Sequence, residues 1–143
     1  MDPASIYRRR AVEGSSPISL IVLLYQTAIQ SLQRAIAALE TGNIEARTTE
    51  LNRAFGVVAE LKAVLDYERG GQVAQQFARF YRITESRMLD ASFRQDPAPL
   101  RELLEPWTQV LDAWRQADVL PPGAASVADP PPPSRLEHVS WQA

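Results

Sequence analysis

Apolar residues recur at spacings of three and four in four separate stretches of the chain, and this periodicity constrains the fold more than any other feature. In the first stretch, which ends near Gly42, the repeated positions are Ile18, Ile21, Tyr25, Ala28, Leu32, Ala35 and Leu39. This spacing places the side chains on one face of an α-helix, whereas a half-buried strand alternates at every second residue. No stretch of the chain alternates in that way, so we expect an all-α fold.

Three further helices are expected at about residues 44–65, 72–93 and 97–117, each with its own apolar stripe. A helix of about 22 residues is roughly 33 Å long. The breaks between the helices are short, which favours antiparallel packing of consecutive helices. The sequence therefore predicts an antiparallel up-and-down four-helix bundle.

Residues that favour helix ends occur at the expected boundaries. Ser16 and Pro17 form a helix-start signal. A serine side chain at the N-cap accepts hydrogen bonds from the free N–H groups of the first turn. Proline suits the first helical position, because the N–H group that it lacks would have no partner there. Gly42 suits the left-handed conformation that ends many helices. Asp96 is the expected cap of the last helix. Pro106 lies inside that helix and is expected to kink it, because it cannot donate to the Glu102 carbonyl.

The composition excludes several classes of chemistry. The chain has no Cys, and His138, near the end of its 143 residues, is its one histidine. Thiolate nucleophiles, Cys-ligated metals, iron–sulfur clusters, multi-His metal sites and His-based triads are therefore absent. We expect no enzyme activity, no cofactor and no metal site.

Charge and hydropathy argue against two further kinds of partner. The net charge is −2, from 15 basic and 17 acidic residues, whereas nucleic-acid binding needs a basic surface. The unbroken apolar run, residues 20–25, is far shorter than the about 20 residues that cross a bilayer. We expect a cytoplasmic protein that neither binds nucleic acid nor inserts into a membrane.

Proline divides the chain into a body and a tail. Six of the eleven prolines lie in residues 118–143, a composition that favours a disordered, partly polyproline extension. We therefore expect a bundle domain over residues 1–117, in which residues 1–15 form a flexible N-terminal cap segment.

The first helix is more apolar than one buried stripe requires. Residues 20–25 are apolar around the whole helix, so something must cover a second face. A neighbouring helix, the N-terminal segment with Ile6 and Tyr7, or a partner helix in a groove would each do so. The alternative is a homodimer, in which the same surplus of apolar surface is buried between two copies of the chain.

Several motifs resemble the family of FliS, the flagellin export chaperone. The first motif, at the start of the chain, consists of Tyr7, Val12, residues 15–17, Leu20, Ile21 and residues 23–25. The second is residues 65–74, between the second and third helices. The third is residues 80–83 with Arg87, Leu89 and Ala91, and the fourth is residues 113–114. They cover residues 7–117 in the family's order and spacing.

The resemblance implies a chaperone that binds the C-terminal segment of flagellin, prevents premature polymerisation and keeps flagellin competent for type III secretion. It implies that Tyr7, with Ile6 and Val12, forms a displaceable cap over a groove. The expected groove residues are Leu20, Leu24, Tyr25, Phe77 and Tyr81. The export gate and other flagellar regulators are further expected partners, and the free protein is expected to be a monomer or weak homodimer. A homodimeric structural or regulatory bundle of the flagellar system remains the alternative.

Overall fold

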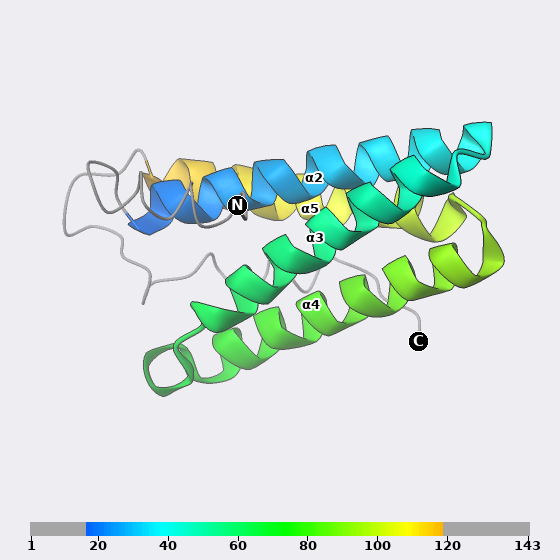
Figure 1. Ribbon diagram of the computed structural model, residues 1–143. Coiled ribbons are helices and arrows are strands. Elements are labelled where there is room, and N and C mark those ends of the chain that lie inside the picture. Colours follow the sequence, from blue (N-terminus) through cyan, green and yellow to red (C-terminus); the bar gives the residue numbers. More distant parts are fainter. Residues whose placement is uncertain (1–16, 119–143) are drawn as a thin grey trace.

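A computed structural model describes residues 17–118 of the chain, and all of its regular elements there are helices. They are α2 (Pro17–Thr41), α3 (Ile44–Ala63), α4 (Tyr67–Arg94) and α5 (Ala98–Asp118). Figure 1 shows that consecutive helices run in opposite directions along one common long axis. The predicted all-α class and the antiparallel arrangement are confirmed.

The helices form a closed ring of four neighbours. α2 packs against α3 and α5, and α4 packs against the same two helices. Among the described residues, the diagonal pairs α2/α4 and α3/α5 have no close backbone approach. One end of the bundle therefore holds the start of α2, the α3–α4 turn and the end of α5, and the other end holds the remaining two turns (Figure 1).

A two-residue turn ends α2 and begins α3. Gly42 has φ +71°, and the next N–H, that of Asn43, donates to the Ala38 carbonyl at 2.8 Å. The left-handed residue predicted at Gly42 is confirmed. The Asn43 side chain then accepts from the Ala46 N–H at 3.0 Å, which caps α3. Apolar periodicity alone does not predict this cap.

The start of α4 differs from the prediction. The helix begins at Tyr67 and not at Gln72, because the Asp66 carboxylate accepts from the N–H groups of Glu68 and Arg69, both at 3.1 Å. The backbone then leaves helical geometry at Gly71, with φ +51° and ψ −124°. The predicted break is therefore a capped helical turn followed by a kink.

α5 begins one residue later than predicted and ends one residue beyond the predicted domain boundary. The Asp96 carboxylate accepts from the Ala98 N–H at 2.9 Å, which leaves Pro97 just outside the helix. The helix continues through Pro106 to Asp118. The predicted Ser16 cap lies outside the described residues.

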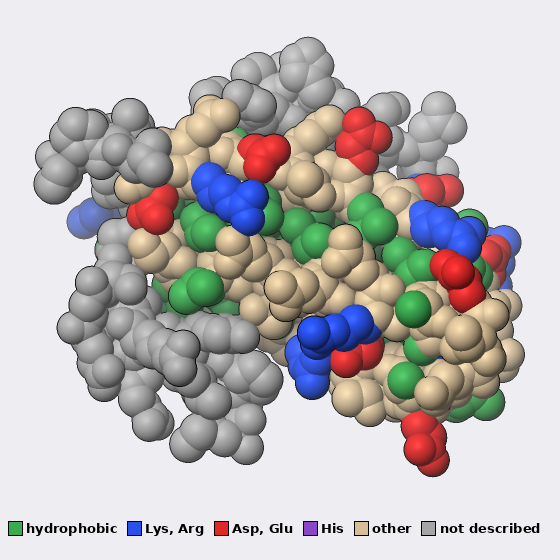
Figure 2. Space-filling view, turned by 90° about the horizontal axis from the view of Figure 1, so that it is seen from above, with side chains coloured by type: hydrophobic (Ala, Val, Ile, Leu, Met, Phe, Trp, Pro, Cys, Tyr) green, Lys and Arg blue, Asp and Glu red, His purple; other side chains and the backbone are tan. Residues whose placement is uncertain are grey.

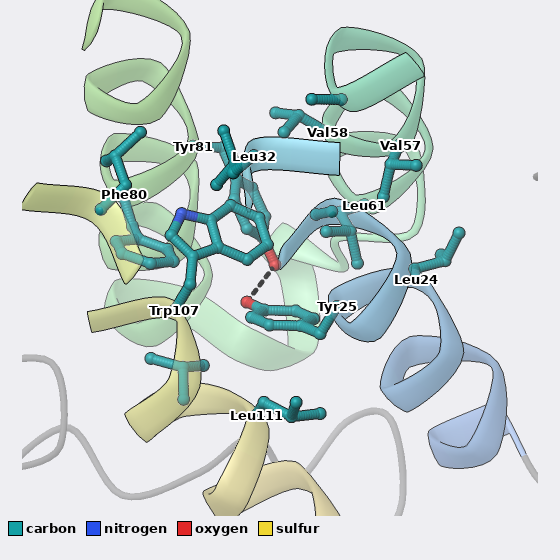
Figure 3. Close-up of a cluster of buried hydrophobic side chains, with 14 of the residues drawn as sticks. Leu24, Tyr25, Leu32, Val57, Val58, Leu61, Phe80, Tyr81, Trp107 and Leu111 are labelled. Atoms are coloured by element: carbon teal, nitrogen blue, oxygen red, sulfur yellow. Dashed lines mark hydrogen bonds between the residues drawn. The ribbon is translucent and has the colours of Figure 1, made fainter. Parts of the chain in front are cut away.

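Aromatic side chains fill the centre of the bundle (Figure 3). Trp107 of α5 is completely buried, and its ring centroid lies 4.7 Å from that of Tyr25 and 5.2 Å from that of Phe80. Large rings span the interior and explain why the diagonal helices stay apart. Each such side chain contributes about 1.5–3 kcal/mol when fully buried, so the aromatic centre accounts for much of the bundle's stability.

Ion pairs join neighbouring helices on the outside. Arg101 of α5 contacts Glu40 of α2 at 2.9 Å, and Lys62 of α3 contacts Glu85 of α4 at 3.1 Å. Exposed pairs of this kind contribute at most about 1 kcal/mol each. They favour the observed order of helices around the ring, whereas burial of the core supplies most of the stability.

Candidate functional site

An apolar hollow opens at the end of the bundle where α3 turns into α4. Its empty volume, with the open mouth included, is about 410 Å³. All four helices contribute to its wall. The lining residues are Ile21, Leu61, Val64, Leu65, Asp66, Gly70, Ala74, Phe77, Tyr81 and Trp114.

The local sequence at the α3–α4 turn shapes the mouth of this hollow. Asp66 caps the first turn of α4, and the kink at Gly71 redirects the chain immediately afterwards. A side chain at Gly70 would place its Cβ 2.8 Å from the Cβ of Ala74, too close for ordinary contact. Gly70 therefore allows the first turn of α4 to fold back closely on the helix.

Aromatic rings form the inner wall of the hollow. The Phe77 ring lies 6.1 Å from the Tyr81 ring and 5.7 Å from the Trp114 ring, measured between centroids. All three residues are at most 4% exposed. The wall is therefore a preformed, rigid apolar surface that suits an apolar side chain of a partner.

Two pairs of polar side chains next to this wall are hydrogen-bonded, whereas the buried indole N–H of Trp114 has no hydrogen-bond partner among residues 17–118. The hydroxyls of Tyr25 and Tyr81 lie 2.9 Å apart and share one hydrogen bond, which either can donate (Figure 3). The Trp107 indole N–H donates to the Thr84 hydroxyl at 2.9 Å, and that hydroxyl donates to the Phe80 carbonyl, also at 2.9 Å. These bonds fix the ring orientations, because a buried polar atom without a partner costs about 1–3 kcal/mol.

Burial raises the pKa of Tyr25 and the pKa of Tyr81 well above their ordinary value. Loss of water around the phenolate is the largest cause in both residues, and repulsion from Tyr25 adds to it for Tyr81. Both hydroxyls stay neutral at physiological pH. They act as structural hydrogen-bonding groups.

Acidic and other ligating side chains do not converge around the hollow. Asp66 is the one charged residue in its lining, and its carboxylate caps α4. Within residues 17–118 no three His, Cys, Asp or Glu side chains gather as a metal site. What the hollow offers a ligand is apolar contact.

The predicted groove residues occupy three different positions. Phe77 and Tyr81 line the hollow. Tyr25, 0% exposed, lies behind Tyr81, and Leu24, 1% exposed, is part of the core on the side of α3 (Figure 3). Leu20 is half-buried on α2. The cap residues Ile6, Tyr7 and Val12 lie outside the described residues.

Other lining residues were not assigned to a site from the sequence. Leu61 and Leu65 belong to the apolar stripe of the second predicted helix, and Trp114 belongs to that of the fourth. Periodicity could not separate them from the core, because a wall residue and a core residue occupy the same face of a helix. The glycine pair after Asp66 was the available signal, since it marks the turn that forms the mouth.

The apolar surplus of α2 divides between core and surface. Ile21, Leu24 and Tyr25 are buried by the neighbouring helices, whereas Leu20, Val22 and Leu23 are only half-buried. Figure 2 shows the side of the molecule that is uppermost in Figure 1, where α2 lies, and hydrophobic side chains are interspersed there with charged and polar ones. Neighbouring helices therefore bury three of these six side chains fully and leave the other three partly exposed.

None of the helices in residues 17–118 is both long enough and apolar enough to cross a membrane.

The chain matches one protein family over the whole described region. The family model described as "Flagellar protein FliS" matches residues 1–120. This range includes the hollow and its whole lining.

Several characterised relatives are similar over most of their length. The flagellar secretion chaperone FliS of Salmonella typhimurium is 32% identical, over 79% of this chain and 84% of its own. The flagellar secretion chaperone FliSB of Pseudomonas aeruginosa is 30% identical, over 72% of this chain and 82% of its own. The Campylobacter jejuni FliS is 30% identical, over 77% of this chain and 86% of its own.

Proposed function

Because the chain belongs to the FliS family of flagellar secretion chaperones, we propose that it is a cytoplasmic export chaperone for flagellin. In this proposal it binds the C-terminal segment of flagellin and prevents that segment from polymerising too early. Bound flagellin then stays competent for flagellar type III secretion. The export gate and other flagellar regulators are its further proposed partners.

The observation that supports this proposal best is the apolar hollow at the α3–α4 end of the bundle. A disordered partner segment loses conformational entropy when it becomes ordered on binding, and burial of apolar surface must offset that loss. The hollow offers a preformed aromatic wall with one charged residue in its lining. An apolar side chain of flagellin that enters the hollow would anchor the segment there.

The predicted groove residues have distinct roles in this proposal. Phe77 and Tyr81 contact the anchoring side chain directly, since both line the hollow. Tyr25 positions Tyr81 through the hydroxyl pair at 2.9 Å. Leu24 supports α2 from inside the core, and half-buried Leu20 extends the binding surface along α2.

The N-terminal segment is the proposed regulator of the same site. Ile21, which lines the hollow, is one helical turn from Pro17, where α2 begins. A segment that precedes Pro17 is therefore tethered next to the hollow at high effective concentration. We propose that Tyr7, with Ile6 and Val12, covers the hollow until flagellin displaces it.

Titration calorimetry with a flagellin C-terminal peptide tests the proposal. We expect one-to-one binding that weakens at least about tenfold, or about 1.4 kcal/mol, in Leu65→Asp, which places a charge at the half-buried wall. Ile44→Asp is the matched control, because Ile44 is 59% exposed at the opposite end of the bundle. Leu24→Asp would test folding and not binding, since Leu24 is 1% exposed.

Two measurements accompany the titration. Circular dichroism must show that Leu65→Asp keeps its helix content, so that lost binding reports on the hollow. A polymerisation assay must show that the wild-type chain delays flagellin assembly. If flagellin polymerises at its normal rate with the wild-type chain in stoichiometric excess, the proposed function is wrong.

A further inference from the structure

A second hollow lies at the opposite end of the bundle, between the α2–α3 turn and the end of α4. We call it the far-end pocket, and its lining includes Ala38, Leu39, Asn43, Arg47 and Gln95. Its empty volume, with the open mouth included, is about 340 Å³. Among the described residues, its wall contains one cation and no carboxylate. Its chemistry therefore differs from that of the hollow at the α3–α4 turn.

The cation of the far-end pocket has no partner within residues 17–118. The Nε atom of Arg47 is buried without a hydrogen bond, and the guanidinium forms no ion pair there. Two nearby carboxylates are already paired, since Glu50 contacts Arg53 at 3.0 Å and Glu40 contacts Arg101 at 2.9 Å. A charged donor that is buried without an acceptor is unfavourable, so a carboxylate that reaches Arg47 would be bound.

A second polar side chain of the pocket has a backbone conformation that its residue type rarely adopts. Gln95, which follows α4, has φ +51° and ψ +43°, in the left-handed region. Glycine is the usual residue in this position, because it has no Cβ. A glutamine there brings a side-chain amide to the pocket that glycine would not provide. Strained residues of this kind cluster at binding sites.

These groups suit a short peptide segment in which an acidic residue lies next to an apolar one. Arg47 would bind the carboxylate, and Leu39 would contact the apolar side chain. The oxygen of the Asn43 side chain caps α3, which leaves its NH₂ group to donate to the segment. The Gln95 amide can both donate and accept.

The chain itself contains such a segment beyond Asp118. Residues 119–143, the tail, have two acidic residues. Asp129 lies between an alanine and a proline, whereas Glu137 directly follows Leu136. Leu136 and Glu137 therefore supply the apolar side chain and the carboxylate that the pocket suits.

The length of the tail matches the distance to be spanned. The described chain ends at Asp118, at the end of the bundle that holds the α3–α4 turn (Figure 1). The far-end pocket is about one length of α5 away, and 21 helical residues span about 30 Å. Residues 119–136 cover up to about 55 Å in the polyproline conformation, which residues 130–133, all proline, favour. Leu136 can therefore reach the pocket.

The segment before Pro17 is the poorer candidate for this pocket. Glu13 follows Val12, but it is four residues from the start of α2 and cannot reach the other end of that helix. Residues 8–10 are three consecutive arginines, which Arg47 would repel.

We propose that the far-end pocket binds the tail of the same chain, with Glu137 on the Arg47 guanidinium and Leu136 against Leu39. Tethering supports this contact, because it holds the tail at a roughly millimolar effective concentration. The contact goes beyond the proposed function, since it uses none of the residues that line the hollow at the α3–α4 turn. Binding of a flagellin peptide is measured separately, so failure of one proposal is distinguishable from failure of the other.

Paramagnetic broadening in NMR spectra of the full chain tests the contact directly. The chain has no Cys, so a nitroxide on Ser140→Cys is its one spin label. We expect the amide signals of Gly42, Asn43 and Gln95 to lose most of their intensity, whereas that of Ala74, in the other hollow, keeps its intensity. Isotope-labelled chain mixed with a separate spin-labelled chain is the control, and it should show no broadening.

Charge variants test the chemistry of the contact. Glu137→Gln changes only the tail, so it leaves the described bundle intact, and we expect the equilibrium constant for docking to fall about tenfold. Arg47→Gln should have the same effect, whereas Arg34→Gln, at an exposed arginine of α2 outside the pocket, should leave the broadening unchanged. The charge-swapped chain with Arg47→Glu and Glu137→Arg should recover the broadening.

The glutamine at the end of α4 provides a variant with two opposite effects. Gln95→Gly should raise the free energy of unfolding, because glycine adopts a positive φ without strain. It should also weaken docking of the tail, because the side-chain amide is lost from the pocket. A purely structural role for Gln95 would leave docking unchanged.

Several outcomes would overturn the docked tail. These are a wild-type chain without broadening at the far-end pocket, or broadening there that Glu137→Gln leaves unchanged. Broadening centred on Ala74 would place the tail in the other hollow and reject this site. Equal broadening in the mixture of two chains would reject docking within one chain.

Discussion

The hydroxyl pair of Tyr25 and Tyr81 connects two helices whose backbones do not approach each other. α2 and α4 lie diagonally in the ring, yet these hydroxyls meet at 2.9 Å in the core. Each hydroxyl is the hydrogen-bond partner of the other, which would otherwise be buried without one. The pair therefore specifies how α4 is rotated relative to α2, and with it which face of Tyr81 borders the hollow.

This pair makes stability depend on pH in the alkaline range. The pKa of both tyrosines is raised in the folded state, whereas the unfolded chain ionises them near about 10. Their contribution is therefore complete below about pH 10 and is lost as pH rises further, because only the unfolded state then releases protons. We expect the denaturation midpoint in urea to fall between about pH 9 and pH 11.5.

Tyrosine-to-phenylalanine variants provide the control for that prediction. Tyr25→Phe alone should lower the free energy of unfolding by about 1–3 kcal/mol at pH 7, because Tyr81 then loses its partner. The double variant Tyr25→Phe/Tyr81→Phe removes both polar atoms and should flatten the alkaline decline. A decline of the same size in the double variant would assign the effect to other groups.

At the scale of single elements, the first turn of α4 depends on Gly71. Its φ of +51° with ψ of −124° is a conformation that residues with a Cβ rarely adopt. Gly71→Ala should lower the free energy of unfolding by about 1–3 kcal/mol. Thermal or urea unfolding measures this loss.

Gly56 is the matched control for Gly71. It lies inside α3, and a Cβ added there would meet nothing within 4 Å. Gly56→Ala should therefore stabilise the protein by up to about 1 kcal/mol, because alanine is the better helix former. If both substitutions change the free energy of unfolding in the same direction, a residue with a Cβ does not pay the expected conformational cost at position 71.

The elements that sequence periodicity predicted well are those in which one face of a helix is buried along its whole length. α2 is such a case, since the repeat from Ile18 to Ala35 is buried at every position and Gly42 ends the helix as expected. The start of α4 was predicted less well. A local Asp66 cap stabilises a turn that carries no apolar stripe, so periodicity could not detect it.

The candidate site was only partly predictable for a different reason. Phe77 and Tyr81 were expected in the groove and do line the hollow, whereas Leu24 lies in the core. All three are apolar positions on buried helix faces. Which of them borders an opening depends on how the helix ends diverge at the Gly71 kink, and that geometry is a tertiary property.

At the scale of the whole molecule, the described chain begins and ends at the same end of the bundle, beside the hollow (Figure 1). Ser19 of α2 donates to the two carboxylate oxygens of Asp118 at 3.1 and 3.0 Å, which ties the start of α2 to the end of α5. α2 has no acidic residue in its own first turn, so the Asp118 carboxylate also complements the positive end of its dipole. A truncation of the C-terminal tail should therefore retain Asp118.

Deletion of the two terminal segments separates their roles in binding. We expect removal of residues 1–15 to tighten binding of the flagellin peptide several-fold, because a cap that occupies the hollow reduces the fraction of binding-competent molecules. Truncation after Asp118 is the matched control and should leave the affinity unchanged, since all the residues that line the hollow remain. Titration calorimetry on the two deletions measures the difference.

Equal affinities in the two deletion variants would reject the cap. Weaker binding without residues 1–15 would instead make that segment part of the binding surface.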